Sequence, residues 1–466
     1  MKYKFIMKEF LDAVNLAVSK FKELNSPVRI ISHLDCDGLT SASILSSAFQ
    51  KQDIKFSLSI IPNLTETILK QLSLEDYKTY FFLDLGSGML KEIEKTLPEK
   101  TIFILDHHQP QDSLTNINHI NPHLFDIDGS EISAAGITYF FAKELNKENI
   151  RLSHLGIIGA IGDMQGKNGF SEIINLILDD AVKADKIEIK KGLRMFGAQT
   201  KPLLKLLLYS TDPYIPGITG NESEVHKFLN ELDISPDKKL TNLTEEETKK
   251  LVTAIILKRL GSEENPEDIF GFNYLLKDEP DESPTKDAKE FSTLLNSCGR
   301  LGKPSVGIGV CLNDKLSKQK ANEILTQFKM ELINSLDWFY SARSSPSVIE
   351  KPGFVIINAE NKIKSSMIGT LTSMISNSNL YPQNTILVSM AHTPEEEIKV
   401  SARVCGRGKD INLKQILNNI TNLIGVESGG HNYAAGSIIP LEKEQEFIQL
   451  VLKQMGTESF LKANPT

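Results

Sequence analysis

The amino-acid sequence predicts an α/β fold, in which a doubly wound parallel sheet and a smaller α/β domain are joined by a mostly helical insert. From residue 27 to about 165, short β-branched and aromatic runs alternate with helical patterns. The same alternation returns after about residue 301, and the stretch between the two regions is mostly helical in pattern. A chain of 466 residues is also too long for one hydrophobic core. We therefore expect domains at residues 1–185, 186–300 and 301–466.

The first element is an amphipathic helix at residues 1–24, because Lys and Glu alternate there with apolar residues at helical spacing. Four strands should follow, apolar on both faces as in a parallel sheet covered by helices. They are VRIISHLD (28–35), FSLSIIP (56–62), YFFLDLG (80–86) and TIFILDHH (101–108). The helices expected between and after them are LTSASILSSAFQ (39–50), TETILKQL (65–72), MLKEIEKTL (89–97) and EISAAGITYFFAKELN (131–146). In such a sheet, function is expected at the carboxyl ends of the strands.

The middle of the chain carries an acidic, Pro-containing stretch at 262–288, which we interpret as a linker or a surface insertion. Beyond it a second α/β region is expected. Its strands are SVGIGVCL (305–312), GFVIINA (353–359), TILVSMA (385–391) and IKVSARVC (398–405), and its helices are SMIGTLTSMISN (366–377) and LKQILNNITNLIG (413–425).

Composition and charge narrow the class of protein. The chain is 40% hydrophobic and 24% charged, and no apolar run approaches the length of a membrane span. Its four cysteines are far apart and form no CxxC, which argues against a disulfide framework and a zinc site. We therefore expect a soluble, cytoplasmic protein without a membrane partner. The net charge is −8, but residues 261–290 hold ten Asp or Glu against three Lys, so charge neither supports nor excludes a nucleic-acid partner.

Asp and His residues cluster where strands or helices are expected to end. They are His33, Asp35 and Asp37; Asp84; Asp106, His107 and His108; and Asp163. On a strand, residues 33, 35 and 37 would face the same side, and a cation would offset the repulsion between the two carboxylates. An isolated DxDG is commonly a loop or a helix cap, and HH alone is a weaker signal. Together, in this order and each after an apolar run, they predict a metal site.

The ligand set combines carboxylate oxygen and imidazole without thiolate. That set favours Mn²⁺ or Mg²⁺, with Co²⁺ or Zn²⁺ as substitutes. There are enough carboxylates for two ions that share one ligand, an arrangement that suits hydrolysis of a phosphate ester.

These motifs resemble those of the DHH phosphoesterase superfamily, and most of all its archaeal RecJ-type nucleases. The resemblance is carried by HLDCDGLTSASIL, LDHHQP, NPHLFDIDGSEISAAGITYFF and LLNSCGRLGKPSVGIGVCL. It implies that one ion is held by His33, Asp35 and Asp84. It implies that a second ion is held by Asp37, Asp84, His107 and Asp163. Asp106 would orient an imidazole, and His108 would contact the scissile phosphate or act as an acid to the leaving oxygen.

The C-terminal region resembles the DHH-associated domain through SSMIGTLTSMIS, KVSARVC and ESGGHNYAAGS. Gly429 and Gly430 would let backbone N–H groups approach a phosphate, and Arg403 and His431 would add side-chain donors. Without the resemblance, a simple tight turn would be the better interpretation of GGH.

The leading hypothesis for function is a metal-dependent exonuclease acting on single-stranded DNA, or RNA, in replication or repair. One alternative is a phosphodiesterase of short oligonucleotides or cyclic dinucleotides, resembling nanoRNases. Another is a replication scaffold that binds the GINS complex, with the acidic insert at 262–288 as a docking surface. The resemblance suggests that an active nuclease could also bind GINS.

Overall fold

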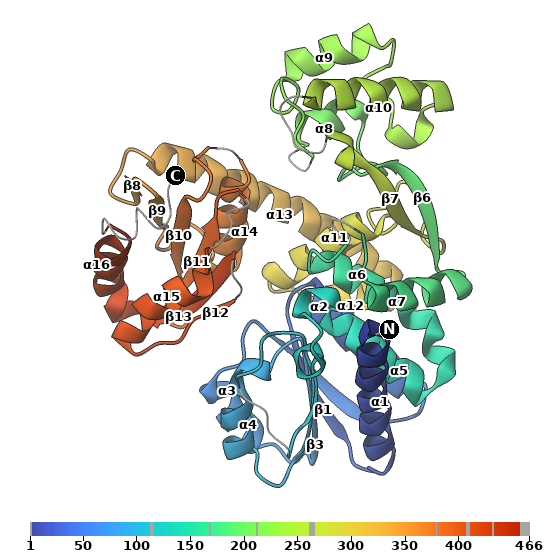
Figure 1. The fold of residues 1–466 in the computed structure, drawn as a ribbon, viewed down its shortest axis with the longest axis vertical. Coiled ribbons are helices and arrows are strands. Elements are labelled where there is room, and N and C mark those ends of the chain that lie inside the picture. The colour runs from blue at the N-terminus through green and yellow to red at the C-terminus, as the bar shows by residue number, and fades with distance from the viewer. Residues whose placement is uncertain are drawn as a thin grey trace. The chain divides into compact units, whose positions relative to one another are not determined.

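The computed structural model describes residues 2–111, 116–166, 169–210, 213–260, 266–378, 380–406, 411–430 and 433–456. The chain forms two compact units, Met1–Leu325 and Thr326–Thr466 (Figure 1). Helix α13 (Lys315–Ala342) runs across the division between them. The domain boundaries expected at residues 185 and 300 stay predictions.

A five-stranded parallel sheet organises the first unit, in the order β2-β1-β3-β4-β5. Its strands are β1 (Val28–His33), β2 (Phe56–Ile61), β3 (Thr79–Leu83), β4 (Thr101–Leu105) and β5 (Asn118–Ile120). Strand β3 is buried at every residue and β1 and β4 at all but one, which is why their sequences are apolar on both faces. The predicted parallel sheet is confirmed.

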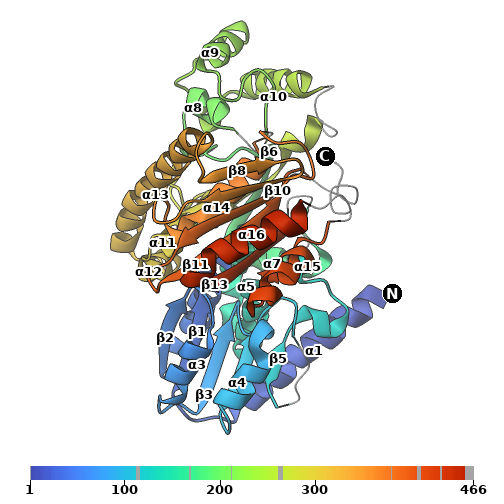
Figure 2. The ribbon, with the colours of Figure 1, turned by 90° about the vertical axis from the view of Figure 1, so that its left-hand side faces the viewer.

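Helices cover both faces of this sheet. Phe81 and Phe103 face a core shared with α1 (Lys2–Lys22), α2 (Cys36–Gln50) and α5 (Ala134–Leu145). Phe82 and Ile104, the next residues along the same strands, face α3 (Glu66–Ser73) and α4 (Leu90–Thr96) (Figure 2). This alternation from one face to the other is the doubly wound arrangement that the sequence predicts.

The first unit continues with α6 (Ser153–Gly162) and α7 (Glu172–Lys183), followed by an antiparallel ribbon of β6 (Ile187–Leu193) and β7 (Phe270–Leu276). Between the two strands, three helices enclose a small apolar core of their own: α8 (Leu203–Leu208), α9 (Glu222–Glu231) and α10 (Glu245–Arg259). The insert is mostly helical, as expected. The interpretation of 262–288 as a linker is wrong for β7, whose backbone pairs with β6 along its whole length.

Residues 305–312 form a helix and not the predicted strand. Helix α12 (Pro304–Cys311) follows α11 (Ala288–Arg300), with Pro at its first position. A short apolar run cannot be assigned to strand or helix by periodicity alone, and here packing decides. A Cβ atom at Gly307 would lie 2.9 Å from the Leu39 side chain, so glycine allows α12 to approach α2.

The second unit holds a six-stranded mixed sheet in the order β12-β13-β11-β10-β9-β8. The strands are β8 (Val348–Lys351), β9 (Phe354–Asn358), β10 (Ile386–His392), β11 (Glu397–Val404), β12 (Gly429–Gly430) and β13 (Ala434–Pro440). Helix α14 (Ser365–Ser376) packs against β10 and β11, and α15 (Leu413–Thr421) and α16 (Glu444–Met455) share an apolar core with the sheet. The second α/β region is therefore confirmed.

Two further expectations concern the whole chain. All four cysteines are free, and Cys36, Cys298 and Cys405 are buried. Across the described ranges, we find no helix with both the length and the apolar character needed to cross a membrane.

Candidate metal centre

The HLDCDG segment is a strand-to-helix turn, so the argument from strand alternation is wrong. Strand β1 ends at His33, and Asp35 is the N-cap of α2, where its carboxylate accepts a hydrogen bond from the Gly38 N–H at 3.1 Å. Asp37 lies in the first turn of that helix. Asp35 is an N-cap because its side-chain oxygen satisfies an N–H that the helix leaves unpaired. The turn still places these residues at the carboxyl edge of the sheet.

Asp84 lies at the middle of the cluster. It directly follows β3 with φ of 58°, a left-handed conformation that is uncommon outside glycine. Its Oδ2 is 3.2 Å from Nδ1 of His33, and its Oδ1 is 3.6 Å from Nε2 of His107. That Oδ1 is buried and accepts no hydrogen bond from the described residues. Because a buried carboxylate oxygen is costly without a partner, its environment suits a cation ligand.

Two groups of potential metal ligands share Asp84. In one, ligand atoms of His33, Asp35 and Asp84 all lie within 4.8 Å of one another. In the other, atoms of Asp84, His107 and His108 meet the same limit. A carboxylate common to two groups is the arrangement that two neighbouring ions need.

His107 is held with one nitrogen turned towards three carboxylates. Its Nδ1 donates to the backbone oxygen of Gly129 at 2.8 Å, so Nε2 is the nitrogen that could bind a metal ion after losing its proton. Nε2 lies 3.9 Å from Asp37, 3.6 Å from Asp84 and 3.7 Å from Asp163. The sequence-predicted residues of the second ion therefore converge on one imidazole.

Asp106 holds the backbone of the DHH turn and the imidazole of His108. Its Oδ1 accepts from the N–H groups of His107 and His108 and from Nδ1 of His108 at 2.7 Å, and its Oδ2 accepts from the Ser87 N–H at 3.0 Å. Although Asp106 is fully buried, these contacts and the His108 imidazole lower its pKa. The His108 side chain is 44% exposed, so it is open to a ligand.

The carboxylates of Asp37 and Asp163 are positioned by backbone and amide donors. Asp37 accepts from the N–H of Ala134 at 2.7 Å and of Ala135 at 3.0 Å, at the N-terminus of α5. Asp163 follows α6 and accepts from Nε2 of Gln165 at 2.9 Å. Sequence analysis missed Gln165, since a glutamine two residues after an aspartate carries no distinctive pattern.

Helix α11 fixes the HLDCDG turn from a distant part of the chain. Oδ1 of Asn296 accepts from the Cys36 N–H at 2.9 Å, between the two aspartates. A Cβ atom at Gly299 would lie 1.7 Å from the Leu34 carbonyl oxygen, so only glycine permits this approach. In the sequence, LLNSCGR (294–300) is distinctive through the family resemblance. Its role could not be read locally, because the two segments are 260 residues apart.

The crowding of charge shows in the titration of the cluster. Burial and Asp84 raise the pKa of Asp37 well above its usual range. Burial and Asp84, opposed by His107, raise the pKa of Asp163 to about 6. Burial works against a charged His33, yet Asp35 and Asp84 raise the pKa of His33 to about 10. Protons on these carboxylates and imidazoles offset the negative charge that a bound cation would otherwise offset. A ligand set of carboxylate oxygens and imidazole nitrogens fits Mn²⁺ or Mg²⁺.

The C-terminal candidates lie in the second unit. Arg403, on β11, donates from Nε to the Ser373 hydroxyl at 3.0 Å and from Nη1 to the Ala402 carbonyl at 2.7 Å. Gly429 and Gly430 form β12. Gly430 has φ of 126°, and a Cβ atom there would lie 2.3 Å from the Ala434 oxygen, which explains the glycine. His431 lies outside the described residues.

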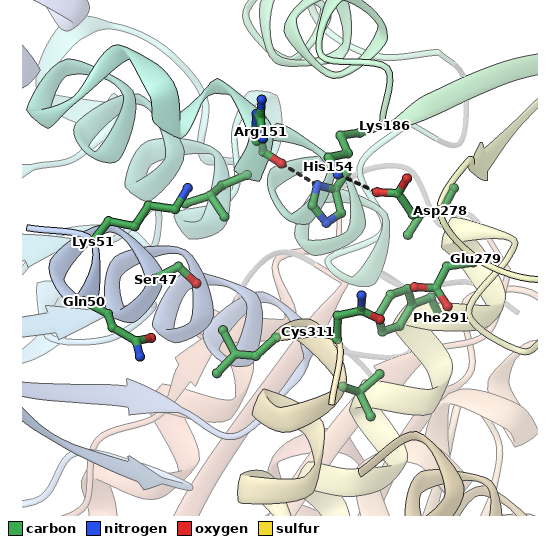
Figure 3. A pocket seen from close by; sticks show the side chains of 15 residues that line it. Ser47, Gln50, Lys51, Arg151, His154, Lys186, Asp278, Glu279, Phe291 and Cys311 are labelled. Atoms are coloured by element: carbon green, nitrogen blue, oxygen red, sulfur yellow. Dashed lines mark hydrogen bonds and ion pairs between the residues drawn. The ribbon is translucent and has the colours of Figure 1, made fainter. Parts of the chain in front are cut away.

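A cavity of about 460 Å³ lies away from this cluster, at the other end of α2 (Figure 3). Ser47 and Gln50, from the last turn of α2, line it, whereas Asp35 and Asp37 lie at its start. His154 donates from Nδ1 to the Arg151 carbonyl at 3.0 Å, and burial lowers the pKa of His154 to about 4. Its imidazole is neutral at pH 7, and within the described residues no metal-ligand group includes it.

Comparison with known proteins matches most of the chain to three family models. Residues 27–159 match the DHH family, N-terminal domain; residues 195–270 match the DHH-CID domain; and residues 352–457 match the DHHA1 domain. The chain is 32% identical over 443 residues to Uncharacterized protein MJ0831 of Methanocaldococcus jannaschii, covering 92% of this chain and 94% of that protein.

Solved structures share the fold at low sequence identity. CDC45 from Entamoeba histolytica matches with a TM-score of 0.62 and 13% identity, covering 97% of this chain and 98% of that chain. RecJ in complex with Mn²⁺ from Thermus thermophilus matches with a TM-score of 0.59 and 13% identity. The match covers 96% of this chain but 55% of that RecJ, so the present chain spans about half of its length. The order of domains, the DHH motif and the family matches together show that the chain belongs to the DHH phosphoesterase superfamily, and its fold is the one that RecJ and CDC45 share.

Proposed function

We propose that this protein is a metal-dependent exonuclease that hydrolyses single-stranded DNA, or RNA, to mononucleotides with two Mn²⁺ or Mg²⁺ ions. The observation that carries the proposal is Asp84, a buried carboxylate that belongs to two ligand groups and has an oxygen without a hydrogen-bond donor among the described residues. Membership of the superfamily supports a hydrolase that acts on phosphate esters.

The residues divide into two ligand sets. His33, Asp35 and Asp84 would hold one ion, and Asp37, Asp84, His107 and Asp163 the other. When bound, such ions activate water and stabilise the charge on the attacking and leaving oxygens of a phosphodiester. The Gly129 carbonyl fixes the His107 tautomer, and the α5 N-terminus orients Asp37.

His108 would serve the leaving group. Burial opposes its charged form, but Asp106 raises the pKa of His108 and so favours the protonated imidazole that a general acid requires. Asp106 acts through His108 as a positioning residue.

In the second unit, we assign phosphate binding to Arg403, to the backbone of Gly429 and Gly430, and to His431. A Cβ atom at Gly429 would meet nothing within 4 Å, so a phosphate oxygen has room to reach this backbone. Arg403 offers a guanidinium suited to phosphate.

The substrate class is supported by the RecJ-type fold, since the solved structures that share it include an exonuclease RecJ bound to manganese. GINS binding, and with it a role in replication, stays a prediction. Co-purification of GINS subunits with the native chain tests it, and loss of GINS on charge reversal of the exposed Asp281 and Glu282 would locate the contact in the acidic insert.

The test of activity uses single-stranded DNA labelled separately at its 5′ and 3′ ends, with Mn²⁺ and with a chelator. Release of mononucleotide from one label, abolished by the chelator, is expected. No release from either label would overturn the exonuclease. Cleavage confined to strands of about two to five nucleotides would instead support the oligonucleotide phosphodiesterase.

A further inference from the structure

We infer that a groove beside the metal centre binds single-stranded nucleic acid by stacking its bases on aromatic side chains. The groove has a volume of about 180 Å³, and we call it the strand groove. Its lining includes Met164, Phe170, Arg194, Phe272, Tyr274 and Lys289. The inference rests on the proposed function, because the strand that it binds is the substrate of that site.

Two residues that line the strand groove are hydrogen-bonded to segments of the candidate metal centre. Gln165 lines it and donates from Nε2 to the Asp163 carboxylate at 2.9 Å. Asn296 lines it and accepts from the Cys36 N–H at 2.9 Å, between Asp35 and Asp37. Two groove residues are thus bonded directly to the segments that carry the candidate ligands. A strand with its terminal phosphodiester at the cluster can pass its next nucleotides into the groove.

The walls of the groove come from separate elements whose side chains face it in register. On α11, Lys289, Ser292, Thr293 and Asn296 line it, at the three- and four-residue spacing of one helix face. On β7, Phe272, Asn273 and Tyr274 line it; the two aromatic residues are two positions apart and therefore on the same face of the strand. The β6–β7 ribbon lies beside α11 in Figure 1, and β7 contacts that helix.

Two large apolar side chains of the groove, Phe272 and Met164, are exposed to solvent. Phe272 is 56% exposed and Met164 is 70% exposed. Met164 directly follows Asp163 and has φ of 61°, a conformation that costs free energy for a non-glycine residue. Phe170 and Tyr274 have ring centroids 4.8 Å apart at 33°; both are partly buried against the main core, and both line the groove together with Phe272. Phe272 is therefore the exposed ring of the groove, and an exposed ring beside polar and charged groups is a surface on which an unpaired base stacks.

The charge of the groove complements a phosphate backbone. Arg194 and Lys289 line it, and residues 186–201 carry five Lys or Arg against one Glu in a chain of net charge −8. The acid at the groove, Asp287, accepts hydrogen bonds from the N–H groups of Lys289 and Glu290 as the N-cap of α11. A groove lined by two cations and by aromatic rings suits a strand of phosphates and bases better than it suits an apolar protein partner.

The first experiment measures binding without hydrolysis. A fluorescent oligothymidine of about 15 nucleotides is titrated with the full chain in chelator, and anisotropy gives Kd at several salt concentrations. We expect Phe272→Ala to raise Kd about tenfold or more, and Phe272→Leu, which keeps apolar bulk but loses the ring, to do nearly the same. Arg194→Gln should make the slope of log K against log salt less steep by roughly one unit, the contribution of one phosphate contact.

The matched control is Phe270→Ala. Phe270 lies on the same strand, is 38% exposed and carries Lys191 over its ring at 5.3 Å, but it does not line the groove. Removal of the Phe270 ring should leave Kd within about twofold of the native value, a smaller change than the rise in Kd expected when a stacked base loses its ring. An equal rise in Kd in Phe270→Ala and Phe272→Ala would show a general effect on the β6–β7 ribbon and would overturn the inference. So would native-like affinity of Phe272→Ala, or no detectable binding by the native chain.

Hydrolysis separates this inference from the proposed function. The ratio of kcat/KM for the strand of about 15 nucleotides to kcat/KM for a dinucleotide should fall about tenfold in Phe272→Ala, because only the longer strand reaches the ring. An unchanged ratio in an active enzyme overturns the groove and leaves the nuclease intact. Strand binding that depends on Phe272 in a chain that cuts neither substrate supports the groove and overturns the nuclease.

Discussion

Asp84 shows how one side chain can join two ligand groups. Its backbone is left-handed, its carboxylate is 3% exposed, and its two oxygens face different histidines. Sequence analysis found Asp84 because it directly follows an apolar strand. The conformation that turns it into the cluster could not be predicted, because φ at this position depends on the packing around the end of β3.

Asp84→Asn should abolish metal-dependent hydrolysis and weaken Mn²⁺ binding by at least about tenfold, because the amide keeps the shape but loses the shared charge. Asparagine tolerates the left-handed backbone, so the fold should be kept. Calorimetric titration of Mn²⁺ together with circular dichroism measures both properties.

Asp53→Asn is the matched control, since Asp53 also has a left-handed backbone, with φ of 53°, but lies exposed after α2. It should bind Mn²⁺ as the native chain does. Native-like Mn²⁺ binding by Asp84→Asn would contradict the role assigned to Asp84.

Metal binding should release protons and strengthen as pH rises. The pKa of His33 is about 10, so its imidazole is charged at pH 7, whereas ligation requires the neutral form. The pKa of Asp163 is about 6, so below that pH the ion must displace a proton from this carboxylate as well. Affinity therefore falls as pH is lowered, most steeply below about pH 6.

Calorimetry in two buffers of different ionisation enthalpy at pH 7 counts the protons released. At least one proton per metal-loaded chain is expected. A binding heat that is the same in both buffers would refute this coupling.

Among elements, α11 links the metal centre to the rest of the first unit, through Asn296 and Gly299 on the HLDCDG turn and through Lys289 on the strand groove. The strands and helices of the parallel sheet could be predicted because each has a long, regular apolar pattern. Helix α12 and the β6–β7 ribbon could not, since their identity depends on partners remote in sequence. The prediction that Asp35 and Asp37 lie on one face of a strand was wrong for a related reason. It extended the strand pattern past His33, where β1 ends and the cap of α2 begins.

Gly299→Ala should destabilise the first unit by about 1–3 kcal/mol, although alanine normally favours a helix. The reason is the added Cβ atom, which would press on the Leu34 carbonyl and push α11 away from the turn. Chemical denaturation measures the decrease in the free energy of unfolding. The Mn²⁺ concentration at half-saturation should rise in the same variant.

For comparison, Gly88→Ala adds a Cβ atom with nothing within 4 Å. Its free energy of unfolding should stay within about 0.5 kcal/mol of the native value. Equal stability of the two variants would show that the close approach of α11 is dispensable.

At the scale of the whole molecule, the chain has separate apolar cores in its two compact units. Separate cores favour separate cooperative transitions, and the candidate metal ligands all lie in the first unit. Sequence analysis predicted two α/β regions because hydrophobic patterning repeats. The division at residue 325 lies inside α13, whose pattern is continuous, so no local signal marks it.

Scanning calorimetry should therefore resolve two unfolding transitions, only one of which responds to Mn²⁺. At a free Mn²⁺ concentration about 100 times Kd, the free energy of unfolding for that transition should rise by about 2.7 kcal/mol. Asp84→Asn should remove the gain and leave the second transition in place. A shift of both transitions, or of neither, would contradict this assignment.

The hydrogen bond between Cys36 and Asn296 also has a consequence for synthesis on the ribosome. Its two partners are 260 residues apart, so at about 5–20 residues per second Cys36 is synthesised roughly 13–50 s before Asn296. During that interval the nascent HLDCDG turn lacks its clamp, and its carboxylates stay accessible to solvent and to folding helpers. Premature termination between the last candidate ligand, Asp163, and residue 296 therefore yields chains that contain every ligand of the first unit but cannot complete the centre.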